Sequence, residues 1–365
     1  MILRYLALLF ALVLPVAAQE DGFTPLFNGK DLSGWVNVNC APETWTVKDG
    51  LLHCDGVPTG ALRTEKQYEN FILELEWRHL KPGGNAGVFI WAGPLSAPGQ
   101  PFLRAIEVQV LDHAYGKSDW FTTHGDVFPI HGSTMKPFGR HNGQRSFPSE
   151  ERSKGSPEWN HYRITCQDGT LRLAVNGKDV SGGEDCTWRK GYIALESEGG
   201  LVDWRNIRLK ELPGGKATPD QTAPLWDGSV TLYDGRSLKG WDAAGPDGDW
   251  RPQDWELVSG GKGGTLTLTK KPGDFRLLFD VRAESKETTA PLPLRLNGQP
   301  LPGQATGRWT RYLITRRGSS VECHVEGATA SPEQGKSRVT VGEGPVEISL
   351  KSDAAVRMGG IYLKE

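Results

Sequence analysis

The chain has 365 residues, a formal net charge of −2, 46 glycines, 24 prolines and 13 tryptophans. This length suffices for two domains, and the near-neutral charge excludes electrostatic binding to nucleic acid. Many turn residues together with many aromatic residues are typical of the short strands of a β-sandwich. We expect most of the tryptophans to lie in the core, and a few to be available for stacking on sugar rings.

The N-terminus, MILRYLALLFALVLPVAA (residues 1–18), has the pattern of a secretory signal peptide. Arg4 precedes an apolar run, and Val16, Ala17 and Ala18 supply small residues at a cleavage site. The run is too short to indicate a membrane span, and no second run follows it. We expect a secreted or periplasmic bacterial protein whose mature chain starts near Gln19 and has no membrane span. An uncleaved anchor is the alternative.

Five cysteines are present, and an exported protein can form disulfides. Four of them, from Cys40 to Cys186, fall in one predicted domain and allow three pairings. We favour Cys40–Cys54 and Cys166–Cys186, because each pair is close in sequence, and this choice leaves Cys323 unpaired. No CxxC spacing occurs, which argues against a zinc–thiolate site.

The chain repeats itself in three segments that recur in the same order, which indicates two copies of one fold. We predict a first domain over residues 19–212, a linker rich in Pro and Gly over 213–225, and a shorter second domain over 226–365. The repeated pairs are LFNGKDLSGW (26–35) with LYDGRSLKGW (232–241), EWNHYRIT (158–165) with RWTRYLIT (308–315), and VDWRNIRLKE (202–211) with VRMGGIYLKE (356–365).

Each copy has the pattern of a series of strands. WTVKDGLLHC (45–54) predicts a hairpin around Asp49 and Gly50. FILELEWRHL (71–80) alternates between apolar and polar residues, as does LRLAVNG (171–177). No segment predicts a helix of three turns. The fold class is therefore all-β, with two tandem β-sandwiches of jelly-roll type.

The first copy contains a long insertion. The interval from Trp35 to Trp159 is much longer than the matching interval from Trp241 to Trp309. The extra residues include the polar and aromatic stretch EVQVLDHAYGKSDWFTTHGD (107–126). A polar insertion on a duplicated scaffold is a candidate functional region, and a decorative or oligomerising loop is the alternative. The second copy is expected to lack the site.

The stretch EVQVLD predicts a strand with two different faces. Glu107 and Gln109 share one face, while Val108 and Val110 share the other. If the valines face the core, Glu107 and Gln109 line the outer, open face of the sandwich. That face is a common place for a carbohydrate. Glu107 is then a candidate acid or base, and Gln109 a candidate partner for sugar hydroxyls.

Titratable and aromatic residues follow this strand. Five of the eight histidines lie between residues 79 and 141, and histidine is the usual proton-transfer group near neutral pH and a common metal ligand. His113 and His124 are candidate catalytic residues, although a loop hydrogen bond is the alternative for each. No HExxH or HxH spacing identifies a metal site. Further candidates for substrate binding are Asp112, Trp120 and Asp126.

Two other strands carry candidate residues. NAGVFIWAG places Asn85 at a strand mouth, with a turn residue as the alternative role, and also contains Trp91 as a candidate sugar-stacking residue. ESEGG places Glu196 and Glu198 near a strand end. A retaining glycosidase needs two carboxylates about 5 Å apart, whereas EVQVLD has Gln where a second carboxylate would stand. A double displacement centred on this strand is therefore disfavoured.

The motifs together resemble the 3-keto-disaccharide hydrolase family over residues 22–212. They are FTPLFNGKDLSGW, WTVKDGLLHC, YENFILELEWR, NAGVFI, EVQVLD, HGDVFP, EWNHYRI, VNGK and SEGGLVDWRNIRL, in this order. The resemblance implies a concanavalin A-like jelly roll and an exported bacterial enzyme that cleaves the glycosidic bond of 3-keto-glycosides or 3-keto-disaccharides. The second copy shares only the scaffold.

The same resemblance implies roles for particular positions. Asn85 matches the family's NSG position, and Glu107, Gln109 and Asp112 match its EVQILD motif. Glu198 belongs to a variant of a position where the family often has His. Glu196 departs from the family, because Gln is usual there.

The family's chemistry needs no nucleophilic carboxylate. A ketone at C3 acidifies the C2 proton, so a base can remove it and the C1 substituent can leave by β-elimination, after which water can add. We expect the base to be His113, His124 or Glu107. A divalent metal ion or a cationic side chain near Glu107 would stabilise the enolate.

Two other functions fit the same pattern. A lectin-like module would use Glu107, Gln109 and a tryptophan to hold a glycan without cleaving it. A structural or adhesive surface protein would need no small-molecule site. The sequence leaves open the sugar at the leaving side, the anomer, the metal and the oligomeric state.

Overall fold

The computed structural model describes residues 22–365, with gaps at 117 and 327–335, so the predicted signal peptide lies outside the described residues. Helices within this described part are three 3-10 turns: η1 (Pro42–Thr44), η2 (His113–Tyr115) and η3 (Pro219–Gln221). None of these is long or apolar enough to cross a membrane. All other regular structure is antiparallel β-sheet, as the alternating pattern of the sequence predicts.

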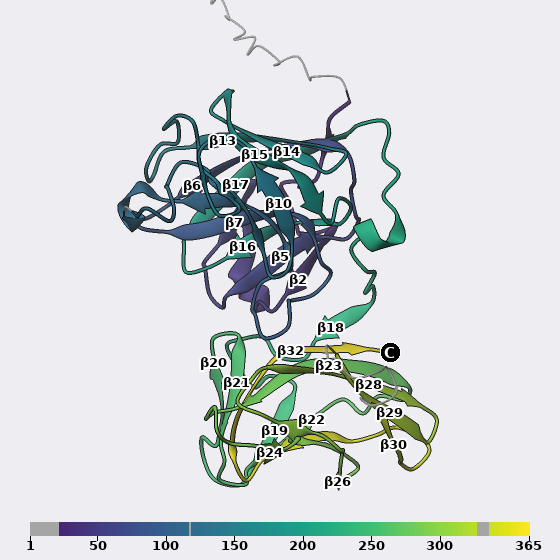
Figure 1. The fold of residues 1–365 in the computed structure, drawn as a ribbon. Helices are drawn as coiled ribbons and strands as arrows, with labels where there is room; N and C mark the ends of the chain where they lie inside the picture. The colour runs from purple at the N-terminus through teal and green to yellow at the C-terminus, as the bar shows by residue number, and fades with distance from the viewer. Residues whose placement is uncertain (1–21, 117, 327–335) are drawn as a thin grey trace, which may run out of the picture.

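The first unit consists of two sheets packed face to face, shown in purple to teal in Figure 1. One sheet has the order β10 (Thr134–Pro137), β15 (Lys178–Thr187), β14 (Thr170–Val175), β13 (Asn160–Gln167), β6 (Phe71–His79), β17 (Val202–Glu211), β4 (Leu51–Cys54) and β3 (Trp45–Lys48), and β1 (Thr24–Pro25) also pairs with β17. The other has the order β11 (His141–Asn142), β12 (Arg145–Ser146), β9 (Val127–Ile130), β8 (Ala105–Leu111), β7 (Asn85–Ala92), β16 (Tyr192–Ser197), β5 (Gly60–Thr64) and β2 (Trp35–Val38).

The second unit, in green to yellow in Figure 1, has two main sheets and one small sheet. The larger has the order β20 (Trp250–Gln253), β21 (Glu256–Gly260), β32 (Ala355–Lys364), β23 (Phe275–Ala283), β28 (Thr310–Arg317), β29 (Ser320–Glu326) and β30 (Lys336–Thr340), with β18 (Ser229–Thr231) on β32. The second has the order β19 (Trp241–Ala244), β22 (Thr265–Leu268), β31 (Ile348–Lys351), β25 (Leu294–Leu296) and β26 (Gln299–Pro300), and β24 (Ala290–Pro291) pairs with β27 (Gln304–Ala305).

The strand orders of the two units match. The order β3-β4-β17-β6-β13-β14-β15 corresponds to β20-β21-β32-β23-β28-β29-β30, and β2-β5-β16-β7-β8 corresponds to β19-β22-β31-β25-β26. The repeated sequence segments fall on corresponding strands. The counterparts of β7 and β8 are only three and two residues long. The strands that carry most of the candidate chemistry in the first unit are therefore much reduced in the second.

Each unit has its own core. In the first unit, Val108 and Val110 point between the sheets, together with Trp77 and Trp204. This position confirms that Glu107 and Gln109 point to the outer face of their sheet, because side chains alternate along a strand. In the second unit, aromatic and aliphatic residues such as Phe279 fill the equivalent space.

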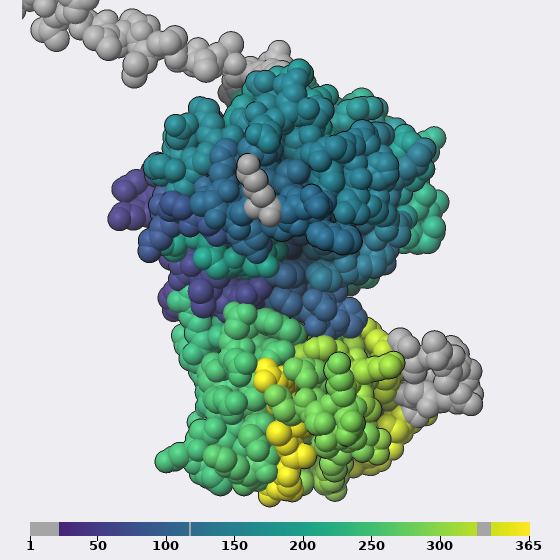
Figure 2. Space-filling view, turned by 60° about the vertical axis from the view of Figure 1, so that its left-hand side comes forward, coloured from purple at the N-terminus to yellow at the C-terminus, as the bar shows by residue number. Residues whose placement is uncertain are grey.

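A third cluster of buried apolar residues joins the two units. Phe89, Tyr192 and Ala194 lie on the outer face of the β8-β7-β16 sheet and pack with Leu278 and Tyr362 of the second unit. Figure 2 shows the two units in direct contact along this junction. The outer face is therefore covered in part, and not open as the sequence predicts, because the second unit packs on it.

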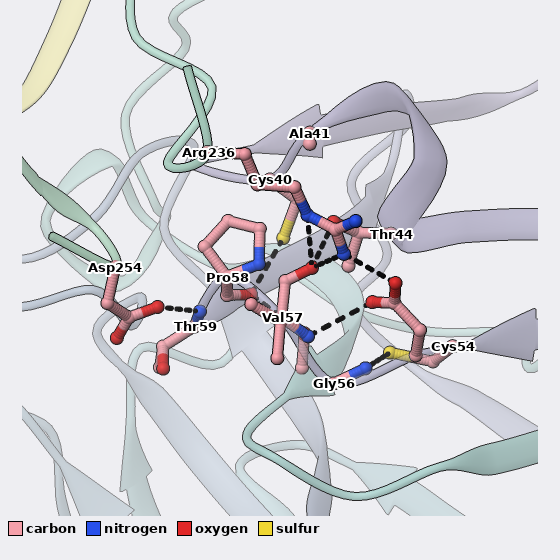
Figure 3. Close-up of polar contacts among 12 residues, drawn as sticks. Cys40, Ala41, Thr44, Cys54, Gly56, Val57, Pro58, Thr59, Arg236 and Asp254 are labelled. Carbon is pink, nitrogen blue, oxygen red and sulfur yellow. Dashed lines mark hydrogen bonds and ion pairs between the residues drawn. The ribbon is translucent and has the colours of Figure 1, made fainter. Parts of the chain in front are cut away.

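Polar contacts surround this apolar junction. Figure 3 shows the Arg236 guanidinium of the second unit against the carbonyl oxygen of Val57, to which its Nε donates at 3.1 Å. The backbone N–H of Thr59 donates to Asp254 Oδ1 at 2.7 Å in the same view. Both partners on the first unit come from the connection between β4 and β5. This connection is thus bonded to the second unit on two sides.

A buried ion pair forms a further polar contact between the units. Arg311 and Asp280 bind each other through two bonds of 2.7 and 2.8 Å. Arg311 Nη2 also donates to the carbonyl oxygen of Ser96 at 2.8 Å, and the N–H of Gly99 donates to Asp280 Oδ2 at 2.9 Å. Charges buried from water need such partners to be stable. The connection between β7 and β8 is therefore fixed to the second unit.

The predicted disulfides are not formed, and all five cysteines are free and buried. Cys40 donates weakly to the carbonyl oxygen of Pro58 at 3.8 Å, and Cys54 accepts from the N–H of Gly56 at 3.4 Å. Cys166 lies on β13 and Cys186 on β15, with β14 between them. Alternate strands are roughly 10 Å apart, which is beyond the reach of a disulfide. The predicted pairing, which was based on closeness in sequence, is therefore wrong.

We expect Arg311→Ala to lower the free energy of unfolding by about 3–5 kcal/mol, because Asp280 would remain buried without its partner. The matched control is Arg338→Ala, whose ion pair with Glu322 lies on the surface and should contribute less than about 1 kcal/mol. Urea unfolding followed by tryptophan fluorescence measures both. Equal effects of the two substitutions would contradict the importance of the buried pair.

Candidate active site

The candidate site lies on three neighbouring strands of one sheet. Strand β7 lies between β8 and β16, and Phe89 pairs with Glu107 while Gly87 pairs with Gln109. On the other side of β7, Asn85 forms a bridge with Glu198. Paired residues point to the same face of a sheet. The outer face therefore collects polar side chains from three separate parts of the sequence.

Two carboxyl groups face each other across Gly87. A Cβ atom at Gly87 would lie 2.8 Å from Glu196 Oε2 and 3.0 Å from Glu107 Oε1. The two oxygens therefore lie on either side of the same small space. Only a residue without a side chain leaves this space clear. Glu107 is 6% exposed and Glu196 is 1% exposed, so both carboxyl groups are largely removed from bulk water.

Burial and mutual repulsion change the acidity of these groups. Burial, and then the neighbouring Glu198, raise the pKa of Glu107 to about 8. Burial, and then Glu107 and Glu198, raise the pKa of Glu196 well above its usual value. Glu196 Oε2 is buried without a hydrogen-bond partner among the described residues. A buried carboxylate without donors is costly, so we assign the proton of the pair to Glu196 first.

A chain of amides leads to the third carboxyl group. Gln109 Nε2 donates to Asn85 Oδ1 at 2.6 Å, and Asn85 Nδ2 donates to Glu198 Oε2. Burial raises the pKa of Glu198 to about 7, although the bond from Asn85 opposes this effect. Glu198 is more exposed than Glu107 and Glu196. The structure thus brings together Asn85, Glu107, Gln109 and Glu198, four of the residues that the sequence singles out.

Arg145 is the cation of the site. Its guanidinium lies 3.4 Å above the centre of the Phe128 ring, and Phe128 pairs with Glu107 across β8 and β9. The positive charge of Arg145 acts to lower the pKa of Glu107, against the larger effect of burial. Arg145 Nη1 also donates to Asp126 Oδ2 at 3.1 Å. A cationic side chain near Glu107 was expected, but no pattern in the sequence indicates which residue supplies it.

Asp126 has a supporting position and not the substrate contact expected of it. Its side chain is fully buried, and it accepts from the N–H of Thr122 at 2.9 Å, from the Thr122 hydroxyl and from Arg145. These bonds fix the loop before β9 and hold the guanidinium of Arg145. No surface of Asp126 remains for a sugar.

His113 and His124 form a pair outside this carboxyl cluster. Their ring centres are 4.6 Å apart, and His113 Nε2 and His124 Nδ1 lie 3.0 and 2.9 Å from the hydroxyl oxygen of Ser153. Ser153 also donates to the carbonyl oxygen of Thr123 at 2.9 Å, so one hydroxyl holds both imidazoles against the loop. Leu111 lies four positions after Glu107, about 13 Å along a strand, and His113 follows beyond that end.

Two other predicted residues have different positions. Asp112 accepts from the backbone N–H groups of Gly83, Ala114 and Ser156 at 2.7–2.9 Å. Burial acts to raise the pKa of Asp112, but these three bonds lower it overall. Asp112 therefore fixes loops and has no free oxygen for substrate. Trp91 is also unsuited to sugar binding, because it is 1% exposed and lies in the core.

Trp120 is 72% exposed, and its neighbour in the same loop, Tyr115, is 48% exposed. Of the two tryptophans predicted to stack on sugar, Trp120 alone has a free ring face. Its loop follows β8, so an aromatic surface lies beyond the end of the strand that carries Glu107.

Within the described part of the chain, no group of three or more His, Cys, Asp or Glu side chains is arranged to hold a metal ion. The predicted alternative, a cationic side chain near Glu107, has a candidate in Arg145.

A family model described as a 3-keto-alpha-glucoside-1,2-lyase-like domain matches residues 22–210. The chain belongs to this family. The match covers the first unit, including all three strands of the carboxyl cluster. A curated relative, the 3-keto-disaccharide hydrolase of Bacteroides thetaiotaomicron, is 27% identical over 55% of this chain and 82% of its own length.

Two solved structures also match about half of the chain. A candidate glycosyl hydrolase of Parabacteroides distasonis is 22% identical over 52% of this chain and 94% of its own, with a TM-score of 0.41. The carbohydrate-binding module CBM66 of Bacillus subtilis is 12% identical over 49% of this chain and 96% of its own, with a TM-score of 0.34.

The raised pKa values predict how stability depends on pH. A carboxyl group with a raised pKa in the folded state stabilises that state below its usual pKa of 4.5, and this contribution is lost as the pH rises towards 8. We expect the free energy of unfolding to fall from pH 5 to pH 8. Glu107→Gln should reduce this fall by about 1–3 kcal/mol.

Urea unfolding at pH 5, 6, 7 and 8 measures the effect. The control is Glu43→Gln, which changes an exposed carboxyl group and should leave the slope unchanged. A wild-type slope that Glu107→Gln does not alter would show that Glu107 titrates normally.

Proposed function

We propose that this protein cleaves the glycosidic bond of 3-keto-glycosides or 3-keto-disaccharides by removal of the C2 proton and β-elimination at C1. The observation that supports this most is the burial of Glu107 beside Glu196 and Glu198, which raises its pKa to about 8. A base with a pKa near or above the working pH is suited to removing a proton from carbon. The family match supports the choice of a 3-keto sugar.

Each step has a candidate residue. Glu107, once ionised, takes the C2 proton, and the electron pair of the C–H bond moves into an enolate whose charge lies on the C3 oxygen. Arg145 is the cation whose charge acts on the pKa of Glu107. In this mechanism it stabilises the charge on the C3 oxygen. Collapse of the enolate forms the C1–C2 double bond and breaks the bond from C1 to the leaving oxygen. Glu198, with a pKa of about 7, supplies the proton to that oxygen.

We assign proton removal to Glu107 in preference to His113 and His124. Both imidazoles contact the hydroxyl of Ser153 and lie near the end of β8, apart from the carboxyl cluster. Water added across the C1–C2 double bond would give hydrolysis overall, and release of the unsaturated ketone would give a lyase. We further propose that the protein is exported and meets its substrate outside the cytoplasm, in line with its N-terminal sequence.

A retaining glycosidase is a second candidate, because oxygens of Glu107 and Glu196 flank the same space at Gly87. Retaining enzymes have two carboxyl groups about 5 Å apart, one as nucleophile and one as acid. The sequence disfavours this mechanism by placing Gln109 where a carboxylate would stand, but Glu196 on a neighbouring strand supplies the second carboxyl group. This mechanism predicts cleavage of ordinary glucosides as well.

A comparison of two substrates tests the proposal. We expect the protein to release nitrophenol from 4-nitrophenyl 3-keto-glucoside, in one or both anomers, and not from 4-nitrophenyl glucoside. Deuterium at C2 should slow release several-fold, because the C2–H bond breaks in the mechanism. Glu107→Gln should lower kcat/KM by about 100-fold or more, whereas His113→Gln should change it by less than about 10-fold.

Cleavage of the ordinary glucoside without an isotope effect would overturn the elimination mechanism and support the retaining glycosidase. Saturable glycan binding without product from either substrate would overturn both and support a lectin-like module. A loss of activity in His113→Gln equal to that in Glu107→Gln would move the base to the histidine pair.

A further inference from the structure

A cavity lies between the two units, and its lining includes none of the residues of the carboxyl cluster. Its volume is about 370 Å³, within the range of small-molecule sites, which starts near 300 Å³. The β7–β8 connection and Trp188 form its wall in the first unit, and β23 with the end of β29 forms the wall in the second. Segment 224–226, which joins the units, closes one side.

Two arginine–tryptophan stacks line this cavity. The Arg104 guanidinium lies 4.0 Å above the centre of the Trp188 ring, and the Arg276 guanidinium lies 4.3 Å above that of Trp226. Stacking fixes the plane of a guanidinium and leaves its N–H groups free to bind a carboxylate through two parallel bonds. Arg104 comes from the first unit and Arg276 from the second, so the cavity has one such group on each side.

Neither of these arginines has an acidic partner within the described part of the chain. Arg104 Nε is buried without any hydrogen bond. Arg311 also borders the cavity, but its charge is balanced by Asp280. The carboxylate of Glu326 is the acidic group in the lining, and His131 is the other titratable side chain. Two unpaired cations thus face one carboxylate, and the cavity has a net positive charge that an anionic ligand would balance.

The walls of the cavity are held in place by the contacts between the units. Ser96 in the β7–β8 connection accepts from Arg311 through its carbonyl oxygen at 2.8 Å. The Ser96 hydroxyl lies 3.0 Å from the hydroxyl of Tyr362, which also donates to Asn39 at 2.7 Å. A site whose walls are already ordered loses little freedom when a ligand binds. The cavity is therefore a built site and not a gap between loosely packed surfaces.

We propose that this cavity binds the carboxylate of a sugar acid, of the hexuronate class, between Arg104 and Arg276. The sugar ring would contact the apolar surface at the cavity mouth, where Leu225 is 68% exposed. The preference for an anion follows from the two unpaired arginines. The choice of a sugar over other carboxylates rests on the proposed function. Binding itself needs no turnover, so the two proposals can fail separately.

Calorimetric titration of the full chain with three probes tests the proposal. Glucuronate carries both the ring and the charge, glucose the ring alone, and acetate the charge alone. We expect glucuronate to bind at least 10-fold more tightly than either of the others. Arg104→Gln and Arg276→Gln should each weaken glucuronate binding about 10-fold or more.

The matched control is Arg172→Gln, which removes an arginine stacked on Phe138 at 4.7 Å outside the cavity and should leave binding unchanged. Equal binding of glucuronate and glucose, or no binding of either, would overturn the site. Acetate binding as tight as that of glucuronate would overturn the choice of a sugar. Glucuronate binding that survives both cavity substitutions would place the ligand elsewhere. Activity on 3-keto-glucosides, measured on the same samples, reports on the proposed function alone.

Discussion

The burial of Glu107, Glu196 and Glu198 together on one face is the constraint around which the candidate site is built. Burial raises the pKa of all three carboxyl groups, the charge of Glu198 raises that of Glu107 further, and the charges of Glu107 and Glu198 raise that of Glu196. The sheet holds them together because β7 lies between β8 and β16, and Gly87 leaves the space between Glu107 and Glu196 empty. The same burial that makes these charges costly supplies both a strong base and a proton donor near neutral pH.

Duplication explains how one face of a sheet can serve two purposes. Both units keep the same strand order, but the counterparts of β7 and β8 in the second unit are reduced to a few residues. Long β7 and β8 extend the outer face of the first unit. One part of that face carries the carboxyl groups, and another carries Phe89 and Ala194, which pack against the second unit. The second unit thus excludes water from a face that would otherwise be open.

The sequence predicted what depends on local pattern and missed what depends on which strands become neighbours. Alternation placed Val108 and Val110 in the core and Glu107 outside, and the local pattern put Glu196 and Glu198 near a strand end. It could not show that β16 would lie next to β7, so Glu196 was not recognised as the second carboxyl group. Trp91 and the cysteines illustrate the same limit, because burial and pairing are set by the packing of distant segments.

The contact between the units connects the two proposed sites physically. Strand β8 begins directly after Arg104, and Glu107 follows three residues later, about 10 Å along the strand. The connection that precedes Arg104 is bonded to Asp280, Arg311 and Tyr362 of the second unit. The second unit lacks long counterparts of β7 and β8, but it holds the connection that leads into the strand that carries Glu107.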